Sequence, residues 1–174
     1  MEQTDVMEDR EARADRALNA YRERRRRRRG EDTWFGSAAC MVEAAAPAEE
    51  TAHRRTEVLD EATAGGMPLS LAEQLYDVGR EEGLDPALAL ELVRCGLGIC
   101  PPDDGVSNAP SQPASDKYAP GWLLQPASPP DDLLRERMLR LSFRRLRALL
   151  EQHPQPADAM RAFAREPDVG VFGY

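Results

Sequence analysis

Several features that would indicate a familiar class of protein are scarce in this chain of 174 residues. No apolar run approaches the roughly 18 residues of a membrane span, so we expect no membrane partner. The amino-terminal segment is acidic and lacks an apolar run, which argues against a signal peptide and against a typical organelle transit peptide. Three cysteines are too few for a secreted disulfide framework. A reducing location, nucleus or cytoplasm, is therefore expected.

Motifs that would build a catalytic or metal centre are also missing. The sequence contains no Gly-rich phosphate loop, and no Ser or Cys stands in an arguable arrangement with a His and an acid. The only histidines, His53 and His153, are isolated, and the C-x4-C spacing of Cys95 and Cys100 does not match a four-ligand zinc site. We therefore predict a protein that is not an enzyme and needs no cofactor.

Lysine is nearly absent, because Lys117 is the only lysine among the 23 basic residues, and the charges are segregated along the chain. Residues 1–30 hold ten arginines against seven acids, and residues 131–174 hold eight against seven. Residues 31–100 hold four arginines against fourteen acids, and the whole chain has a net charge of −8. An acidic middle between two arginine-bearing ends predicts pairing within the chain, in competition with any external anion.

These shifts in composition divide the chain into four regions. Residues 1–36 are predicted to form a disordered, basic and largely solvated arm, and residues 37–100 an acidic helical region. Residues 101–130, which hold eight of the 14 prolines, are predicted to form an extended linker, and residues 131–174 an arginine-rich helical region. The predicted fold class is mostly α: a small helical body, made of a helix pair near residues 70–95 and C-terminal amphipathic helices, with a disordered arm and a Pro-rich linker.

Within the arm, residues 4–29 have the pattern of a solvated helix with a sparse apolar edge of Val6, Leu18 and Tyr21. The segment ends in six arginines that repel one another, so we expect this end to be extended or frayed without a counter-anion. Three interpretations of the run stay open: a nuclear-import signal, a nucleic-acid contact, or a solvated charge run. The import candidates are Arg24, Arg25, Arg26, Arg27, Arg28 and Arg29.

The helix pair near residues 70–95 is the clearest local structure. Ser70 and Glu73 have the spacing of a capping box at the start of the first helix, and Gly83 is suited to end it in a left-handed conformation. Asp85 is suited to cap the second helix, with a proline in its first turn. Apolar periodicity predicts further helices over residues 48–64 and 156–165.

The sequence REEGLDPALALELVRCGLG, residues 80–98, resembles the helix pair of lytic transglycosylases, in which a similar G-[LV]-D-P-A-L stretch precedes an aliphatic helix. In that family the helix leads into a Glu-Ser pair whose glutamate is the catalytic acid. The corresponding positions here lie near Gly96 and Leu97, so the acid is absent. The shared residues are those that any capped helix pair requires, and we expect no peptidoglycan activity.

The segment DDLLRERMLRLSFRRLRALLEQ, residues 131–152, predicts an amphipathic helix with two faces. One is an apolar stripe for burial, formed by Leu139, Phe143, Leu146 and Leu150. The other is an arginine stripe at spacings of three, four and three, formed by Arg137, Arg140, Arg144 and Arg147. We expect this stripe to pair within the chain, with acids such as Glu81, Glu82 and Glu91. Exposed pairs of this kind are weak, so an acidic partner protein would easily replace them, and we interpret the stripe as its contact.

An apolar island, KYAPGWLLQP, interrupts the linker. Its apolar residues are Tyr118, Trp122, Leu123 and Leu124. They either clip the linker onto the helical body or form a short motif for a partner's groove. We favour the clip, because an exposed Trp-Leu-Leu would be an apolar patch. Ser128 precedes a proline and the arginine helix, and is a hypothetical phosphorylation site.

These features together predict a non-enzymatic adaptor or regulatory protein that binds another protein through the arginine stripe and the apolar island. The alternative is a nucleic-acid-associated protein that uses both arginine-rich segments. The sequence does not indicate an oligomeric state.

Overall fold

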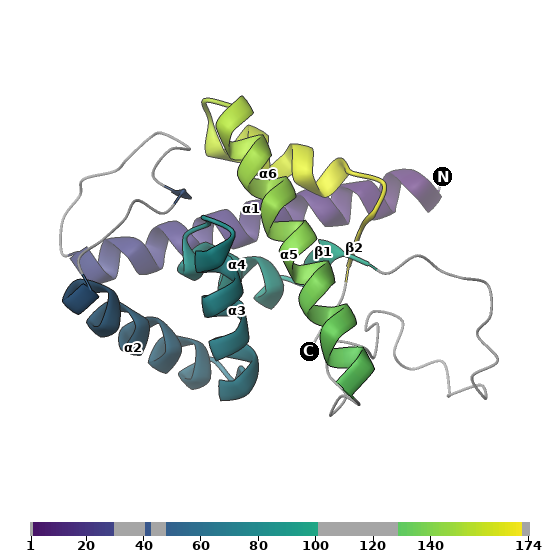
Figure 1. Cartoon of the computed structure of the whole chain (residues 1–174). Coiled ribbons are helices and arrows are strands. Elements are labelled where there is room, and N and C mark those ends of the chain that lie inside the picture. Colours follow the sequence, from purple (N-terminus) through teal and green to yellow (C-terminus); the bar gives the residue numbers. More distant parts are fainter. Residues whose placement is uncertain (1, 30–40, 43–47, 101–128, 172–174) are drawn as a thin grey trace.

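The computed structural model describes residues 2–29, 41–42, 48–100 and 129–171, and its fold is mostly helical (Figure 1). The elements in chain order are α1 (Glu2–Arg29), α2 (Ala48–Ala64), α3 (Leu69–Glu81), α4 (Pro86–Arg94), β1 (Leu97–Ile99), α5 (Pro129–Gln152), α6 (Pro156–Arg165) and β2 (Val169–Val171). The predicted fold class, mostly α, is therefore confirmed. The helices predicted over residues 48–64 and 156–165 have the predicted bounds, and the two short strands were not predicted.

A single hydrophobic core joins all the helices of the described residues. The helix α1 packs against α6 and α4, while α5 packs against α6, α3 and β1. Figure 1 shows α5 crossing in front of this body, with α6 beside α1. The four residues of the predicted apolar stripe on α5 are all buried: Leu139, Phe143, Leu146 and Leu150. That burial fixes which side of α5 turns outward.

The expectation of a disordered, largely solvated arm is wrong for residues 2–29, which form the packed helix α1. Its inner face is built at spacings of three, one and three by Ala14, Ala17, Leu18 and Tyr21, all of them buried. Small side chains let α1 approach its neighbours closely, so a sequence with little apolar character still packs. The arginine run is not frayed either: the helix continues to Arg29, because acids of α2 and α4 face it.

The α3–α4 pair is confirmed, but the capping box at its start is wrong. Pro68 is the N-cap of α3, no side chain caps the helix, and the Ala72 N–H donates to the Pro68 carbonyl at 3.0 Å. The first turn therefore closes before Ser70 can act as a cap. Gly83 has φ +74°, as its predicted left-handed role requires. Asp85 caps α4 by accepting the Ala87 N–H at 3.1 Å.

The two strands pair antiparallel, with Leu97 opposite Val171 and Ile99 opposite Val169. The Ile99 N–H also donates to the hydroxyl of Ser142 on α5 at 2.7 Å. Ser142 is itself buried, and its hydroxyl donates to the Met138 carbonyl at 3.0 Å. The strand pair therefore joins the segment after α6 to the segment after α4, and β1 attaches it to α5.

Candidate binding surfaces

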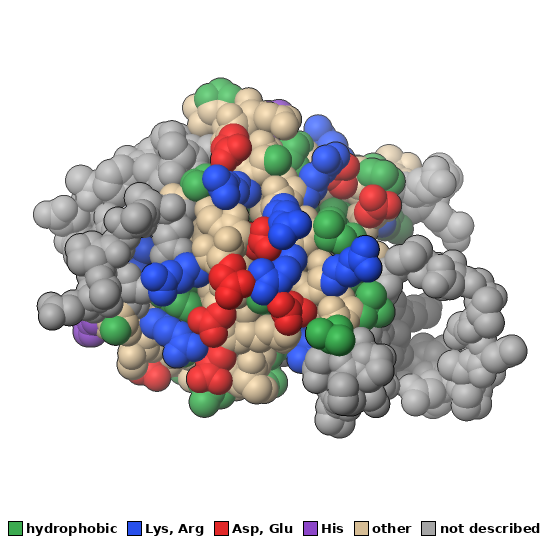
Figure 2. All heavy atoms as spheres, in the orientation of Figure 1, with side chains coloured by type: hydrophobic (Ala, Val, Ile, Leu, Met, Phe, Trp, Pro, Cys, Tyr) green, Lys and Arg blue, Asp and Glu red, His purple; other side chains and the backbone are tan. Residues whose placement is uncertain are grey.

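The predicted arginine stripe lies on α5, and most of it faces the end of α3. Arg140 and Arg144 both donate to the carboxylate of Glu82, at 3.2 and 3.1 Å. Arg147 donates to the backbone carbonyl of Glu82 at 3.2 Å, and Arg140 also pairs with Glu81 at 2.6 Å. Figure 2 shows the resulting mixture of basic and acidic side chains across the centre of this face. The pairing within the chain that the sequence predicted is confirmed for Glu81 and Glu82.

Glu82 is the centre of this arrangement because it is only 8 % exposed. Hydrogen bonds from Arg144 and then Arg140 hold the pKa of Glu82 below its usual value, against the opposing effect of burial. A buried carboxylate that lost these partners would remain as an uncompensated charge. Arg140 and Arg144 are therefore structural contacts between α3 and α5.

The outward side of α5 carries a different row of residues, which we call the Leu–Arg face. It consists of Leu133, Leu134, Arg137, Leu141 and Arg145. Leu133 is 70 % exposed, and Leu134 and Leu141 are each 39 % exposed. Arg137 is exposed and makes no ion pair with any described residue. Arg145 pairs with Glu166 at 2.8 Å and is half exposed.

The sequence placed Arg137 in one stripe with Arg140, Arg144 and Arg147, but Arg137 does not share their contacts with Glu82, and the exposed leucines beside it were not predicted. Leu133, Arg137, Leu141 and Arg145 follow one another at intervals of four, which places them in one row along the helix. The signal was present in the sequence, but the stronger apolar stripe of α5 accounted for its hydrophobic pattern. Only the fold shows that a second group of leucines is left outside the core.

The arginine run is divided by the helix into an inner and an outer face. Inward, the Nε atom of Arg24 lies 2.7 Å from Glu91 on α4, and the Nε atom of Arg28 lies 3.1 Å from Glu61 on α2. Outward, Arg26 and Arg27 are 65 % and 73 % exposed, and both pair with Glu23 of their own helix.

Glu91 was expected as a partner of the stripe on α5, but it pairs instead with Arg24 and with Arg94 of its own helix. The correction follows from position. The side chain of Glu91 lies on the side of α4 that faces α1, whereas the arginine stripe meets the end of α3.

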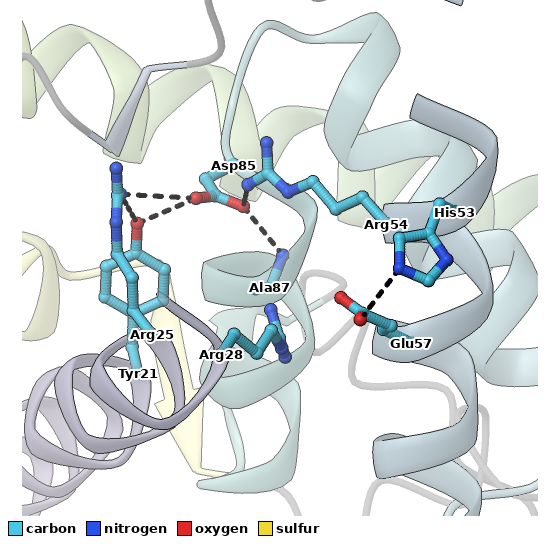
Figure 3. A pocket seen from close by; sticks show the side chains of 8 residues that line it. All are labelled: Tyr21, Arg25, Arg28, His53, Arg54, Glu57, Asp85 and Ala87. Carbon is cyan, nitrogen blue, oxygen red and sulfur yellow. Dashed lines mark hydrogen bonds and ion pairs between the residues drawn. The ribbon is translucent and has the colours of Figure 1, made fainter. Parts of the chain in front are cut away.

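A cavity of about 260 Å³ lies between α1, α2 and the start of α4 (Figure 3). Its lining consists of Tyr21, Arg25, Arg28, His53, Arg54, Glu57, Asp85 and Ala87. Asp85 accepts the Tyr21 hydroxyl at 2.7 Å and a guanidinium N–H of Arg54 at 2.6 Å. Figure 3 shows Tyr21 and Arg25 on one side of this carboxylate and Arg54 on the other.

The chemistry of this cavity favours structure over reaction. Burial and the neighbouring Asp85 carboxylate raise the pKa of Tyr21, while Arg25 opposes them, so the phenol keeps its proton. His53 is exposed and pairs with Glu57 at 3.2 Å, away from the phenol–carboxylate contact. The Asp85 carboxylate thus connects α1, α2 and α4.

The two described cysteines, Cys95 and Cys100, are single thiols. Cys95 and Cys100 are free and partly buried, and burial raises the pKa of both thiols. Within the described ranges, no group of His, Cys, Asp and Glu side chains is arranged to hold a metal ion. Several predicted residues lie outside the described ranges: Cys40, Tyr118, Trp122, Leu123, Leu124 and Ser128.

No protein-family model matches the chain, and neither does any curated protein or solved structure. Among the described residues, no helix is both long enough and apolar enough to cross a membrane. The fold therefore defines a mostly α-helical protein, and its function has to be argued from its surfaces.

Proposed function

We propose that this protein is a non-enzymatic adaptor or regulatory protein that binds a partner protein through the Leu–Arg face of α5. The observation that carries this proposal is the exposure of Leu133, Leu134 and Leu141 on a helix whose other side is fully used by the core. Grouped exposed leucines on a surface helix are typical of a protein contact. A nuclear or cytoplasmic location belongs to the proposal and rests on the sequence alone.

The chemistry of the face indicates the kind of partner. Leucines supply apolar area for the centre of an interface, and arginine is among the residues enriched there. Arg137 stands between Leu133 and Leu141, so its aliphatic stem can lie along the same surface while its charge reaches the rim. A partner with an apolar groove and acidic residues at its edge would be complementary. This arrangement leaves Arg140 and Arg144 with Glu82.

The proposal predicts that Leu133→Glu with Leu141→Glu will weaken partner binding at least about tenfold, because two apolar contacts are replaced by charges. The measurement is affinity capture from native lysate treated with nuclease, followed by titration of the captured protein against wild type and variant. Both leucines are exposed, so the variant should keep the circular dichroism and unfolding temperature of the wild type.

The matched control is Leu69→Glu, which adds one charge at a leucine of α3 that is 53 % exposed. It should leave partner binding unchanged. Equal binding by wild type and the double variant, with both folded, would refute the Leu–Arg face as the contact surface. Loss of all captured material on nuclease treatment would favour a nucleic-acid function instead.

A further inference from the structure

The last turns of α1 are held in a different way from the rest of the helix. Tyr21 is the last buried apolar residue of α1, and residues 22–29 read RERRRRRR, with no apolar side chain. No hydrophobic contact therefore fixes this end of the helix. Its position depends on ion pairs with other elements: Arg24 with Glu91, Arg25 with Asp85 and Arg28 with Glu61.

The three acids pair with the arginines at this end of α1 in the positions that an external anion could take. Glu61 comes from α2, Asp85 from the N-cap of α4, and Glu91 from the middle of α4. Each of them lies within 4.0 Å of at least one inward arginine of the run. The acidic middle of the chain thus covers the inner face of the run, while Arg26 and Arg27 remain outside.

We propose that the arginine end of α1 is a nucleic-acid-binding surface that Glu61, Asp85 and Glu91 mask within the chain. The partner is identified by what the segment lacks. A protein–protein interface has an apolar centre, and residues 22–29 supply none. A phosphate backbone requires only closely spaced cations, and arginine binds phosphate oxygens through paired N–H groups. This surface is separate from the Leu–Arg face of α5.

Of the masking contacts, the one made by Glu61 is the one that a polyanion can most easily replace. The Glu61 side chain is 32 % exposed, so its pair with Arg28 is partly open to solvent and screened by it. Glu91 is only 3 % exposed, so release of Arg24 would leave it as a buried charge. Burial, with the nearby Glu61 carboxylate adding to it and Arg28 opposing it, raises the pKa of Glu91 to about 7. A proton can therefore take the place of Arg24.

The test is fluorescence anisotropy with a labelled DNA duplex of about 20 base pairs, titrated with the full chain at several salt concentrations. Glu61→Gln removes one masking charge and should tighten DNA binding about two- to fivefold at low salt, the equivalent of one exposed ion pair. The matched control is Asp77→Asn. Asp77 is an exposed acid that, like Glu61, pairs with an arginine of another helix, in this case Arg55, which lies outside the run.

Because both variants change the net charge equally, only unmasking of the run distinguishes them. Equal affinity of Glu61→Gln and Asp77→Asn would overturn the proposal. Adding Arg24→Gln and Arg28→Gln to Glu61→Gln should remove the gain and reduce the salt dependence, and persistence of the gain would also overturn it. A gain for polyglutamate without a gain for DNA would replace nucleic acid by an acidic protein segment as the partner.

Discussion

Asp85 and Glu91 are buried carboxylates only six residues apart, yet they differ in the number of their hydrogen-bond partners. Asp85 accepts hydrogen bonds from Tyr21, from Arg54 and from the Ala87 N–H, so both of its oxygens are used. Glu91 has one oxygen close to Arg24, and its other oxygen has no hydrogen-bond partner among the described residues. Both oxygens of the first carboxylate have hydrogen-bond partners, whereas the second carboxylate is prone to bind a proton.

This difference predicts a pH dependence of stability that belongs to Glu91. Burial raises its pKa from 4.5 to about 7, so between these values the folded chain binds a proton that the unfolded chain has lost. The free energy of unfolding should therefore fall as pH rises through this window, by at most about 3 kcal/mol. Urea unfolding of the wild type and of Glu91→Gln at pH values across the window measures the effect.

In Glu91→Gln this decrease should be absent, since the amide does not titrate. Asp77→Asn is the matched control, because Asp77 is an exposed acid on α3 whose carboxylate pairs with Arg55 and not with a histidine. It should keep the pH dependence of the wild type. An identical dependence in wild type and Glu91→Gln would show that Glu91 is charged throughout.

At the scale of elements, the apolar periodicity predicted the helices well, but the N-cap of α3 was misplaced and the two strands were not predicted. The stripe of α5 and the bounds of α2 and α6 follow from the spacing of apolar residues. The cap of α3 was misplaced because Pro68 begins the helix by backbone geometry alone. The strands β1 and β2 have three residues each, and the paired residues are at least 70 positions apart, so no local pattern indicated them.

The turn between α3 and α4 gives a prediction of its own. Gly83→Ala should lower the free energy of unfolding by about 1–2 kcal/mol, because φ is +74° and an added Cβ atom would also displace the guanidinium of Arg147. Gly66→Ala is the matched control, with φ +91° and open space around the added atom. Chemical denaturation of both variants should show a loss in each and the larger loss for Gly83→Ala. A smaller loss there would mean that the Arg147 contact is dispensable.

For the whole molecule, the segregation of charge along the chain predicted which regions pair with one another better than any single motif did. The acidic middle of the chain pairs with both arginine-bearing ends, as expected: with the run of α1 through Glu61 and Glu91, and with α5 through Glu82. Which acid meets which arginine was not predictable, because the pairs connect residues far apart in the sequence. The packing of α1 was missed, since two of the four residues of its inner face are alanines.

If α1 is part of the core, Leu18→Ala should lower the free energy of unfolding by about 2–4 kcal/mol, because Leu18 is only 1 % exposed. Leu133→Ala is the matched control at a leucine that is 70 % exposed, and it should change stability by less than about 0.5 kcal/mol. Thermal or urea unfolding of the two variants and the wild type measures these differences in the free energy of unfolding. A harmless Leu18→Ala would mean that α1 does not pack on the body.

The near absence of lysine has a consequence for the chemical modification of this protein. Every cross-helix ion pair of the described residues has arginine as its cation, and the only lysine side chain of the sequence is Lys117. Guanidinium groups stay charged at all physiological pH values and are not substrates for lysine acetylation or ubiquitination. Side-chain amine modification, by enzymes or by cross-linking reagents, is therefore confined to one position outside α1 to α6, and it would leave these ion pairs intact.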